Sequence, residues 1–197
     1  FGGGESLRDN DPTRGSELCS AVEFMYSLEE MMKITGNPFY AEYLERITFN
    51  ALPTQMSEDF RLHQYFQQTN QVSISYGNHN FTTMKEGTGN VMGFLTGYPC
   101  CLSNLHQGYP KFTQNLWLRS SDGGLAAMAY SPCRVSTEVD GVQVELNEVT
   151  SYPYDERIRI EVHPSEPVTF PMSLRIPSWS ADPQIKVNGQ LQGDVAS

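Results

Sequence analysis

The chain has few charged residues, few cysteines and no long apolar run. Charged residues make up 18 % of its 197 residues, and the net charge is −10. No segment forms a basic stripe, so a nucleic acid is not an expected partner. A transmembrane helix needs about eighteen or more consecutive apolar residues, and no such run is present. Apolar residues nevertheless reach 39 % and aromatic residues 11 %, which is typical of a folded protein rather than a disordered one.

Several familiar signals are also missing. The sequence begins at Phe1 with neither a methionine nor a signal peptide, and we interpret it as the interior of a longer protein. Four cysteines are too few for a disulfide scaffold, and a bond between the neighbours Cys100 and Cys101 would close a strained ring. No two histidines have the His-x-x-x-His spacing of a helical metal site, so no histidine is expected to be a ligand.

Helical periodicity dominates the first half. Ser16 is predicted to cap a helix whose apolar residues recur at spacings of three and four as far as Thr35-Gly36. Asn37-Pro38 is predicted to open a second helix that ends near residues 50–53.

Periodicity then weakens from residue 56 to residue 98. This polar segment is interpreted as a functional loop, with a β-like run near residues 72–76. A third helix is expected after Pro99, broken or bent at Pro110.

The pattern changes at the turn cluster of residues 120–124. Runs with a period of two follow, and Asn188-Gly189 predicts a hairpin turn. The alternating runs are residues 125–130, 142–146, 158–162 and 170–176. Short strands at such spacing predict an antiparallel β-sandwich. We therefore expect a helical module over residues 1–118 and a β module over residues 119–197.

Three thiols and a carboxylate form the most informative pattern. Glu17 and Cys19 are expected at the start of the first helix, and Cys100 and Cys101 at the start of the third, where helix dipoles favour anions. Cysteine sulfur and glutamate oxygen suit a four-coordinate zinc ion, and a metal-bound thiol facing a pocket is a candidate nucleophile. The alternative is that the thiols are buried core residues, since metal sites more often use Cys-x-x-Cys spacing.

Four other residues also carry side chains that could serve a site. Glu5 follows three glycines and either presents a carboxylate to a cleft or belongs to a frayed terminus. Glu45 either forms a surface charge pair with its neighbour or points inward. Cys133 is interpreted as a passive thiol. Trp179 is interpreted as a packing residue of the sandwich rather than a platform for a sugar ring.

Together these residues resemble the β-L-arabinofuranosidases of glycoside hydrolase family 127, over nearly the whole chain. The motifs are Gly4-Glu5, Glu17-Leu18-Cys19, Tyr40-Ala41-Glu42-x-x-Glu45-Arg46, Cys100-Cys101 with Asn104, Leu174-Arg175-Ile176-Pro177-x-Trp179 and Val187-Asn188-Gly189. The resemblance implies the C-terminal part of an (α/α)6 barrel followed by an antiparallel β-sandwich.

The resemblance also assigns roles to individual residues. It implies that zinc is held by Glu17, Cys19, Cys100 and Cys101. Cys100 would be the nucleophile and Glu5 the general acid/base of a retaining glycosidase, in place of the usual pair of carboxylates. Glu45 matches a position that contacts sugar hydroxyls.

The chain departs from the family pattern in three places. The loop between Glu5 and Glu17 is shorter than in the family's arabinofuranosidases. A substrate-contacting tyrosine of the family is replaced near Gln67, which we take as a substrate-binding residue. The N-terminal helices of the barrel are absent, so the chain alone is expected to be inactive.

The expected partner is a carbohydrate, and a periplasmic or secreted location suits glycan breakdown. The alternative function is a non-catalytic carbohydrate-binding or structural module with a structural zinc.

Overall fold

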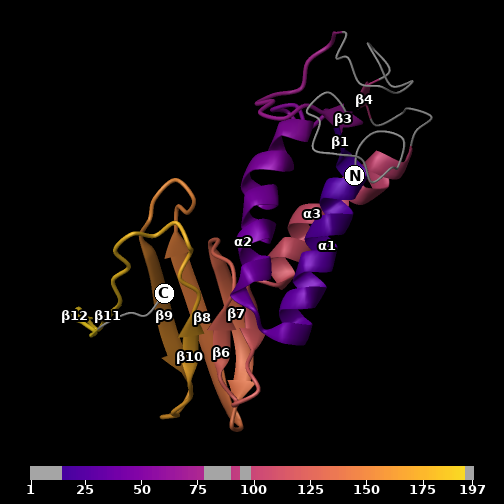
Figure 1. The fold of residues 1–197 in the computed structure, drawn as a ribbon. Helices are drawn as coiled ribbons and strands as arrows, with labels where there is room; N and C mark the ends of the chain where they lie inside the picture. The colour runs from indigo at the N-terminus through magenta and orange to yellow at the C-terminus, as the bar shows by residue number, and fades with distance from the viewer. Residues whose placement is uncertain (1–14, 78–89, 94–98, 194–197) are drawn as a thin grey trace. The chain divides into compact units, whose positions relative to one another are not determined.

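The structure of the chain is a computed structural model that describes residues 15–77, 90–93 and 99–193. It forms two compact units (Figure 1). The first unit comprises Phe1–Thr35 and Tyr43–Asn115, and the second comprises Gly36–Glu42 and Leu116–Ser197. One of the boundaries between the units, after Glu42, therefore falls inside the helix formed by Pro38–Arg46.

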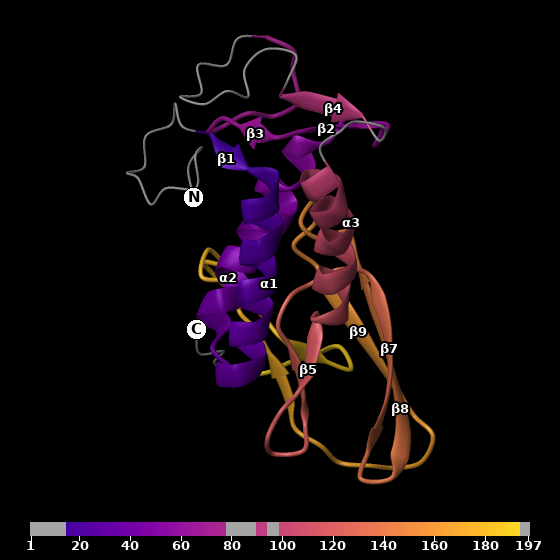
Figure 2. The same ribbon diagram turned by 90° about the vertical axis from the view of Figure 1, so that its right-hand side faces the viewer.

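Two long helices lie side by side in the first unit, α1 (Leu18–Thr35) and α3 (Pro99–Gln114) (Figures 1 and 2). The predicted apolar face of α1 is confirmed at Val22, Met25, Leu28 and Met32, which are buried together with Leu18. Tyr26, which was expected on the same face, is 41 % exposed. Gly36 adopts a left-handed φ of 64° directly after α1, which is the usual way for glycine to end a helix.

The helix α2 (Pro38–Arg46) begins as predicted. The Asn37 side-chain oxygen accepts a hydrogen bond from the Phe39 N–H at 2.9 Å, and proline occupies the first helical position. The regular helix ends at Arg46 and continues as a π-helical turn, Ile47–Ala51, and a 3-10 turn, Pro53–Gln55. The predicted stop near residues 50–53 is thus the end of the π-helical turn.

A break or a bend was expected at Pro110, and the break was wrong. α3 runs through this residue to Gln114. Proline removes one backbone donor, but the turn around it is held by packing, because Phe112 is buried and Gly108 lies against Leu52. A Cβ atom at position 108 would lie 2.9 Å from the Leu52 Cδ2 atom.

Four short strands lie near the end of the first unit where α1 and α3 begin (Figure 2). They form two antiparallel pairs: β1 (Ser16–Glu17) with β3 (Phe66–Gln67), and β2 (Leu62–Gln64) with β4 (Val91–Gly93).

The β-like run expected at residues 72–76 is not a strand. These residues are irregular and directly follow a turn at residues 69–70. Asn70 has a left-handed φ of 62°, and the Gln71 amide donates hydrogen bonds to Gln64 Oε1 and to the Ser73 carbonyl, both at 2.8 Å.

The second unit contains two three-stranded sheets. One has the order β7-β8-β9 and is antiparallel throughout, while in the other, β10-β6-β5, strand β10 is parallel to β6. The strands are β5 (Trp117–Arg119), β6 (Leu125–Ala127), β7 (Cys133–Val139), β8 (Val142–Thr150), β9 (Ile158–Pro164) and β10 (Met172–Leu174). The expectation of a purely antiparallel module was therefore wrong at β10.

The predicted hairpin is present near the C-terminal end. β11 (Lys186–Val187) pairs with β12 (Gln190–Leu191) across Asn188 and Gly189, whose φ angles are 51° and 82°. Two successive positive φ angles define the tight turn that Asn-Gly favours.

The chain is thus of mixed α and β class, as expected. The barrel and the sandwich remain predictions. Among the helices that the structure describes, none is long and apolar enough to cross a membrane.

Candidate metal centre

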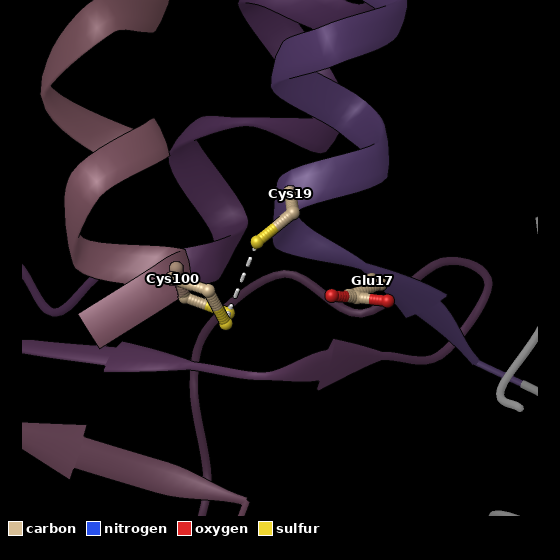
Figure 3. Close-up of side chains that lie close together, drawn as sticks. Glu17, Cys19 and Cys100 are labelled. Atoms are coloured by element: carbon tan, nitrogen blue, oxygen red, sulfur yellow. Dashed lines mark hydrogen bonds between the residues drawn. The ribbon is translucent and has the colours of Figure 1, made fainter. Parts of the chain in front are cut away.

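The two expected clusters meet where α1 and α3 begin. Cys19 lies in the first turn of α1, and Cys100 and Cys101 lie in the first turn of α3 directly after Pro99. Figure 3 shows the Cys19 and Cys100 side chains directed toward each other, with the Glu17 carboxylate beside them. Proline is well suited to the first position of a helix, so Pro99 determines where α3 begins. It thereby places both cysteines in the first turn.

Glu17 was expected in the first turn of a helix, but it lies in the strand β1. This strand pairs with β3, so that Glu17 stands opposite Phe66, and the next residue, Leu18, donates its N–H to the Tyr65 carbonyl at 3.0 Å. The Asn90 side chain fixes the other side of β3 through two hydrogen bonds to the Phe66 backbone, at 2.8 and 2.9 Å. Glu17 is thereby held by a small sheet instead of a helix turn.

The four potential ligand atoms converge. One atom each from Glu17, Cys19, Cys100 and Cys101 lies within 4.8 Å of the others. The Cys101 sulfur is 3.6 Å from the Cys19 sulfur and 3.9 Å from the Cys100 sulfur. Tetrahedral zinc with bonds of about 2.3 Å separates two sulfur ligands by about 3.8 Å. Spacing and donor types therefore both fit a zinc ion.

The thiols differ in environment. Cys101 is buried, Cys19 is half-buried and Cys100 is exposed. The hydrogen bond between the Cys19 and Cys101 thiols lowers the pKa of Cys19 to about 7. The same contact, together with burial, raises the pKa of Cys101 well above the usual range. Burial, followed by the charge of Cys19, raises the pKa of Cys100. An ionised Cys19 thus makes ionisation of Cys100 and Cys101 less favourable. A bound divalent cation would remove this repulsion between thiolates.

Two residues beside the cluster had no assigned role. Asn104, one turn along α3 from Cys100, hydrogen-bonds Cys19 and lowers the pKa of that thiol. Burial, and then the hydrogen bond and charge of Glu17, raise the pKa of the Tyr65 hydroxyl. Asn104 could have been identified from the sequence, because it lies four residues after Cys100 and such residues are neighbours on a helix surface. No local pattern indicated Tyr65, because only the pairing of β3 with β1 brings it to Glu17.

The other expected site residues lie outside this cluster. Glu45 is buried on α2. Gln67 is buried in β3 opposite Ser16, and its amide oxygen accepts a hydrogen bond from the Thr54 hydroxyl at 2.6 Å. Neighbouring residues of a strand face opposite sides, so Gln67 and the Phe66 side chain opposite Glu17 point in different directions. Glu5 lies outside the described residues, and its role stays a prediction.

Comparison with known proteins gives a consistent assignment. Residues 4–114 match the family model described as β-L-arabinofuranosidase, GH127 catalytic domain, and residues 124–196 match the GH127 middle domain. No curated protein matches the chain.

Solved structures share the fold. A GH127 β-L-arabinofuranosidase from Geobacillus stearothermophilus T6 has a TM-score of 0.76 at 22 % identity, covering 92 % of this chain and 28 % of that protein. A glycoside hydrolase has a TM-score of 0.76 at 21 % identity, with 95 % and 30 % covered. A GH127 β-arabinofuranosidase has a TM-score of 0.71 at 22 % identity, with 93 % and 29 % covered.

The chain spans less than a third of the length of each of these structures. The catalytic-domain model alone matches more than half of the chain. The chain therefore belongs to glycoside hydrolase family 127, the β-L-arabinofuranosidase family.

Proposed function

We propose that this chain carries the nucleophile of a retaining glycoside hydrolase that releases β-L-arabinofuranose, or a related pentose, from plant-type glycans. The observation that carries the proposal is the convergence of three sulfur atoms and one carboxylate within 4.8 Å, in a chain of this family. The named activity of the structurally similar enzymes supports the choice of sugar.

Exposure separates the roles of the two adjacent cysteines. Cys101 is buried and serves as a ligand only, whereas Cys100 is exposed and can meet a substrate. Its sulfur attacks the anomeric carbon, the bond from that carbon to the leaving oxygen breaks, and the sugar is held as a thioglycoside of Cys100. Attack by a thiolate is far more effective than attack by a thiol.

Glu5 is proposed to manage the proton in both steps. It gives a proton to the leaving oxygen in the first step. In the second step it takes a proton from a water molecule, which attacks the same carbon and breaks the carbon–sulfur bond. Two displacements at one carbon retain its configuration. Glu45 and the Gln67 amide are proposed to bind sugar hydroxyls.

Zinc is the proposed metal, held by Glu17, Cys19, Cys100 and Cys101. When bound, it would keep the Cys100 sulfur ionised at neutral pH. The same proposal places residues 1–118 in the C-terminal part of an (α/α)6 barrel and residues 119–197 in a β-sandwich.

Metal analysis tests the ligand set. The purified chain is expected to bind one zinc per molecule, and C101S is expected to lose it. C133S is the matched control, because Cys133 lies in β7 outside the cluster and should leave zinc binding unchanged. A chain that binds no zinc, or a C101S variant that binds it as well as the original, would refute the metal centre.

Chemical modification and turnover test the role of Cys100. In a full-length protein containing this chain, a furanosyl haloacetamide should alkylate Cys100, and L-arabinose should protect it. C100S should lose more than about a thousandfold in kcat on an aryl β-L-arabinofuranoside. An inert Cys100 and full activity of C100S would instead support a structural zinc in a non-catalytic module.

A further inference from the structure

An exposed tryptophan in the second unit lies on top of a buried aromatic stack. Trp179 is 51 % exposed, and its ring lies parallel to that of Tyr152, with centroids 6.2 Å apart and 19° between the planes. Tyr152 is only 6 % exposed and meets Tyr130 edge-on at 5.9 Å. Trp179 therefore packs against Tyr152, as the expected packing role requires, but half of its surface is exposed to solvent.

The segment carrying this ring is held by an ion pair. The Glu42 carboxylate accepts hydrogen bonds from the Ser178 N–H at 3.0 Å and the Ser178 hydroxyl at 2.9 Å. It also accepts one from the Arg175 guanidinium at 2.6 Å, and Arg175 in turn donates to the Met128 carbonyl at 2.6 Å. The backbone next to Trp179 is thus fixed before any ligand arrives, which lowers the entropic cost of binding.

We propose that the exposed face of Trp179 is a binding platform for a neutral sugar ring of a glycan. The face of an aromatic ring carries partial negative charge, and the C–H groups on one side of a sugar ring are weakly positive, so the two stack. Tryptophan is also enriched at interaction interfaces, because its ring system combines a large apolar face with a polar N–H group.

The charge of the chain and its membership of the glycosidase family both restrict the class of glycan that Trp179 could bind. The net charge of −10 repels acidic polysaccharides, which favours a neutral glycan. The choice of an arabinose-containing glycan rests on the proposed function, whereas stacking on Trp179 does not. The platform would hold a polymer through a ring that is not being cleaved.

The chain offers a direct optical test, because it has only two tryptophans. Trp117 is 9 % exposed and donates its indole N–H to Glu148 at 2.9 Å, so acrylamide should quench mainly Trp179. Soluble linear arabinan should protect the accessible tryptophan from acrylamide at least twofold. In W179F, arabinan should leave the remaining fluorescence unchanged.

Affinity electrophoresis in gels containing arabinan tests binding itself. W179A should bind at least tenfold more weakly than the original chain, and polygalacturonate should retard neither. F60A is the matched control, because Phe60 is also an exposed aromatic residue, at 63 %, but belongs to the first unit. If W179A does not fold, protection of Trp179 in the unaltered chain still decides the question.

Two further measurements separate this proposal from the proposed function. In the full-length protein, C100S should keep arabinan binding while losing turnover, and W179A should lose arabinan binding while keeping turnover of a small aryl glycoside. The platform is refuted if W179A binds arabinan normally, or if arabinan does not protect Trp179. It is also refuted if Trp179 of the full-length protein resists acrylamide without any glycan, since protein would then cover the ring.

Discussion

The Tyr65 hydroxyl is placed to orient a metal ligand without being one. It hydrogen-bonds the Glu17 carboxylate, which would occupy one of the four positions around zinc. Partners of this kind fix the direction of a ligand, and their loss typically costs about 10- to 100-fold in metal affinity.

We therefore expect Y65F to weaken zinc binding by about 10- to 100-fold while zinc still binds one per chain. Competition with a chromophoric chelator measures the affinity. Y76F is the control, because Tyr76 is exposed and should behave like the original chain. An unchanged affinity in Y65F would show that Glu17 is oriented by its strand alone.

Glu29 is a buried carboxyl group on the face of α1 that packs in the first unit. It is 1 % exposed, and neither oxygen makes a well-formed hydrogen bond within the described part of the chain. Burial raises its pKa to about 7, the charge of Glu30 raises it slightly, and Lys33, Lys111 and Asn115 each lower it slightly. The folded state therefore favours the protonated carboxyl group.

This shift predicts a pH-dependent stability with a definite sign. Because the pKa is higher in the folded state than the ordinary 4.5, Glu29 destabilises the fold as pH rises from about 4.5 to 7, by up to about 3 kcal/mol. Urea denaturation from pH 4 to 8 should show a smaller loss for E29Q than for the original chain. E30Q, which removes an exposed neighbour, should retain the loss, and equal pH profiles for all three proteins would contradict the prediction.

The contrast between Cys101 and Tyr65 shows which site residues a sequence reveals. Adjacent cysteines are rare enough to be noticed, and their meeting with Cys19 follows from two helices that begin at the same end. Tyr65 reaches the cluster only because β3 pairs with β1 in a particular register. Register between distant two-residue strands depends on tertiary packing, and no local pattern encodes it.

At the scale of elements, the turn leading into β6 depends on two glycines for different reasons. A Cβ atom on Gly124 would overlap the backbone carbonyl oxygen of Pro171, which accepts a hydrogen bond from Leu125 at 3.0 Å. Gly123 has open space around it but a left-handed φ of 83°. One position requires the absence of a side chain, and the other requires an unusual backbone conformation.

G124A is therefore expected to cost about 2–3 kcal/mol of unfolding free energy, since backbone must move away. G123A should cost about 1 kcal/mol, which is the strain of a left-handed alanine. Denaturation followed by tryptophan fluorescence measures both, because both tryptophans belong to the second unit. A G124A variant as stable as G123A would mean that the turn and the segment at Pro171 separate readily.

Element boundaries were predictable where local chemistry determines them. The expected boundaries formed at three places. Asn37-Pro38 begins α2, Gly36 follows the end of α1, and Asn188-Gly189 forms the hairpin turn. Pro110 and residues 72–76 did not follow their local preferences. The helix α3 continues through Pro110 with Phe112 buried and Gly108 against Leu52, and the Gln71 side chain stabilises the turn before residue 72. The parallel β10 was unpredictable for a related reason, because alternation gives the faces of a strand and not its direction.

At the scale of the whole molecule, the two units carry different spectroscopic signals. α1 and α3 belong to the first unit, whereas Trp117 and Trp179 belong to the second. Circular dichroism at helical wavelengths therefore reports mainly on the first unit, and tryptophan fluorescence reports on the second. The candidate ligands all belong to the first unit and join segments about eighty residues apart in sequence.

Removal of zinc should therefore destabilise the two units unequally. A metal that binds only the folded state, present at a thousandfold its dissociation constant, adds about 4 kcal/mol of stability. A chelator should then shift the urea transition seen by circular dichroism to lower urea and leave the fluorescence transition in place. C133S should respond like the original chain, while C101S, which lacks a ligand, should not respond. Equal shifts of both transitions would instead mean that the units unfold together, because stabilisation at the cluster would then be shared by the β sheets of the second unit.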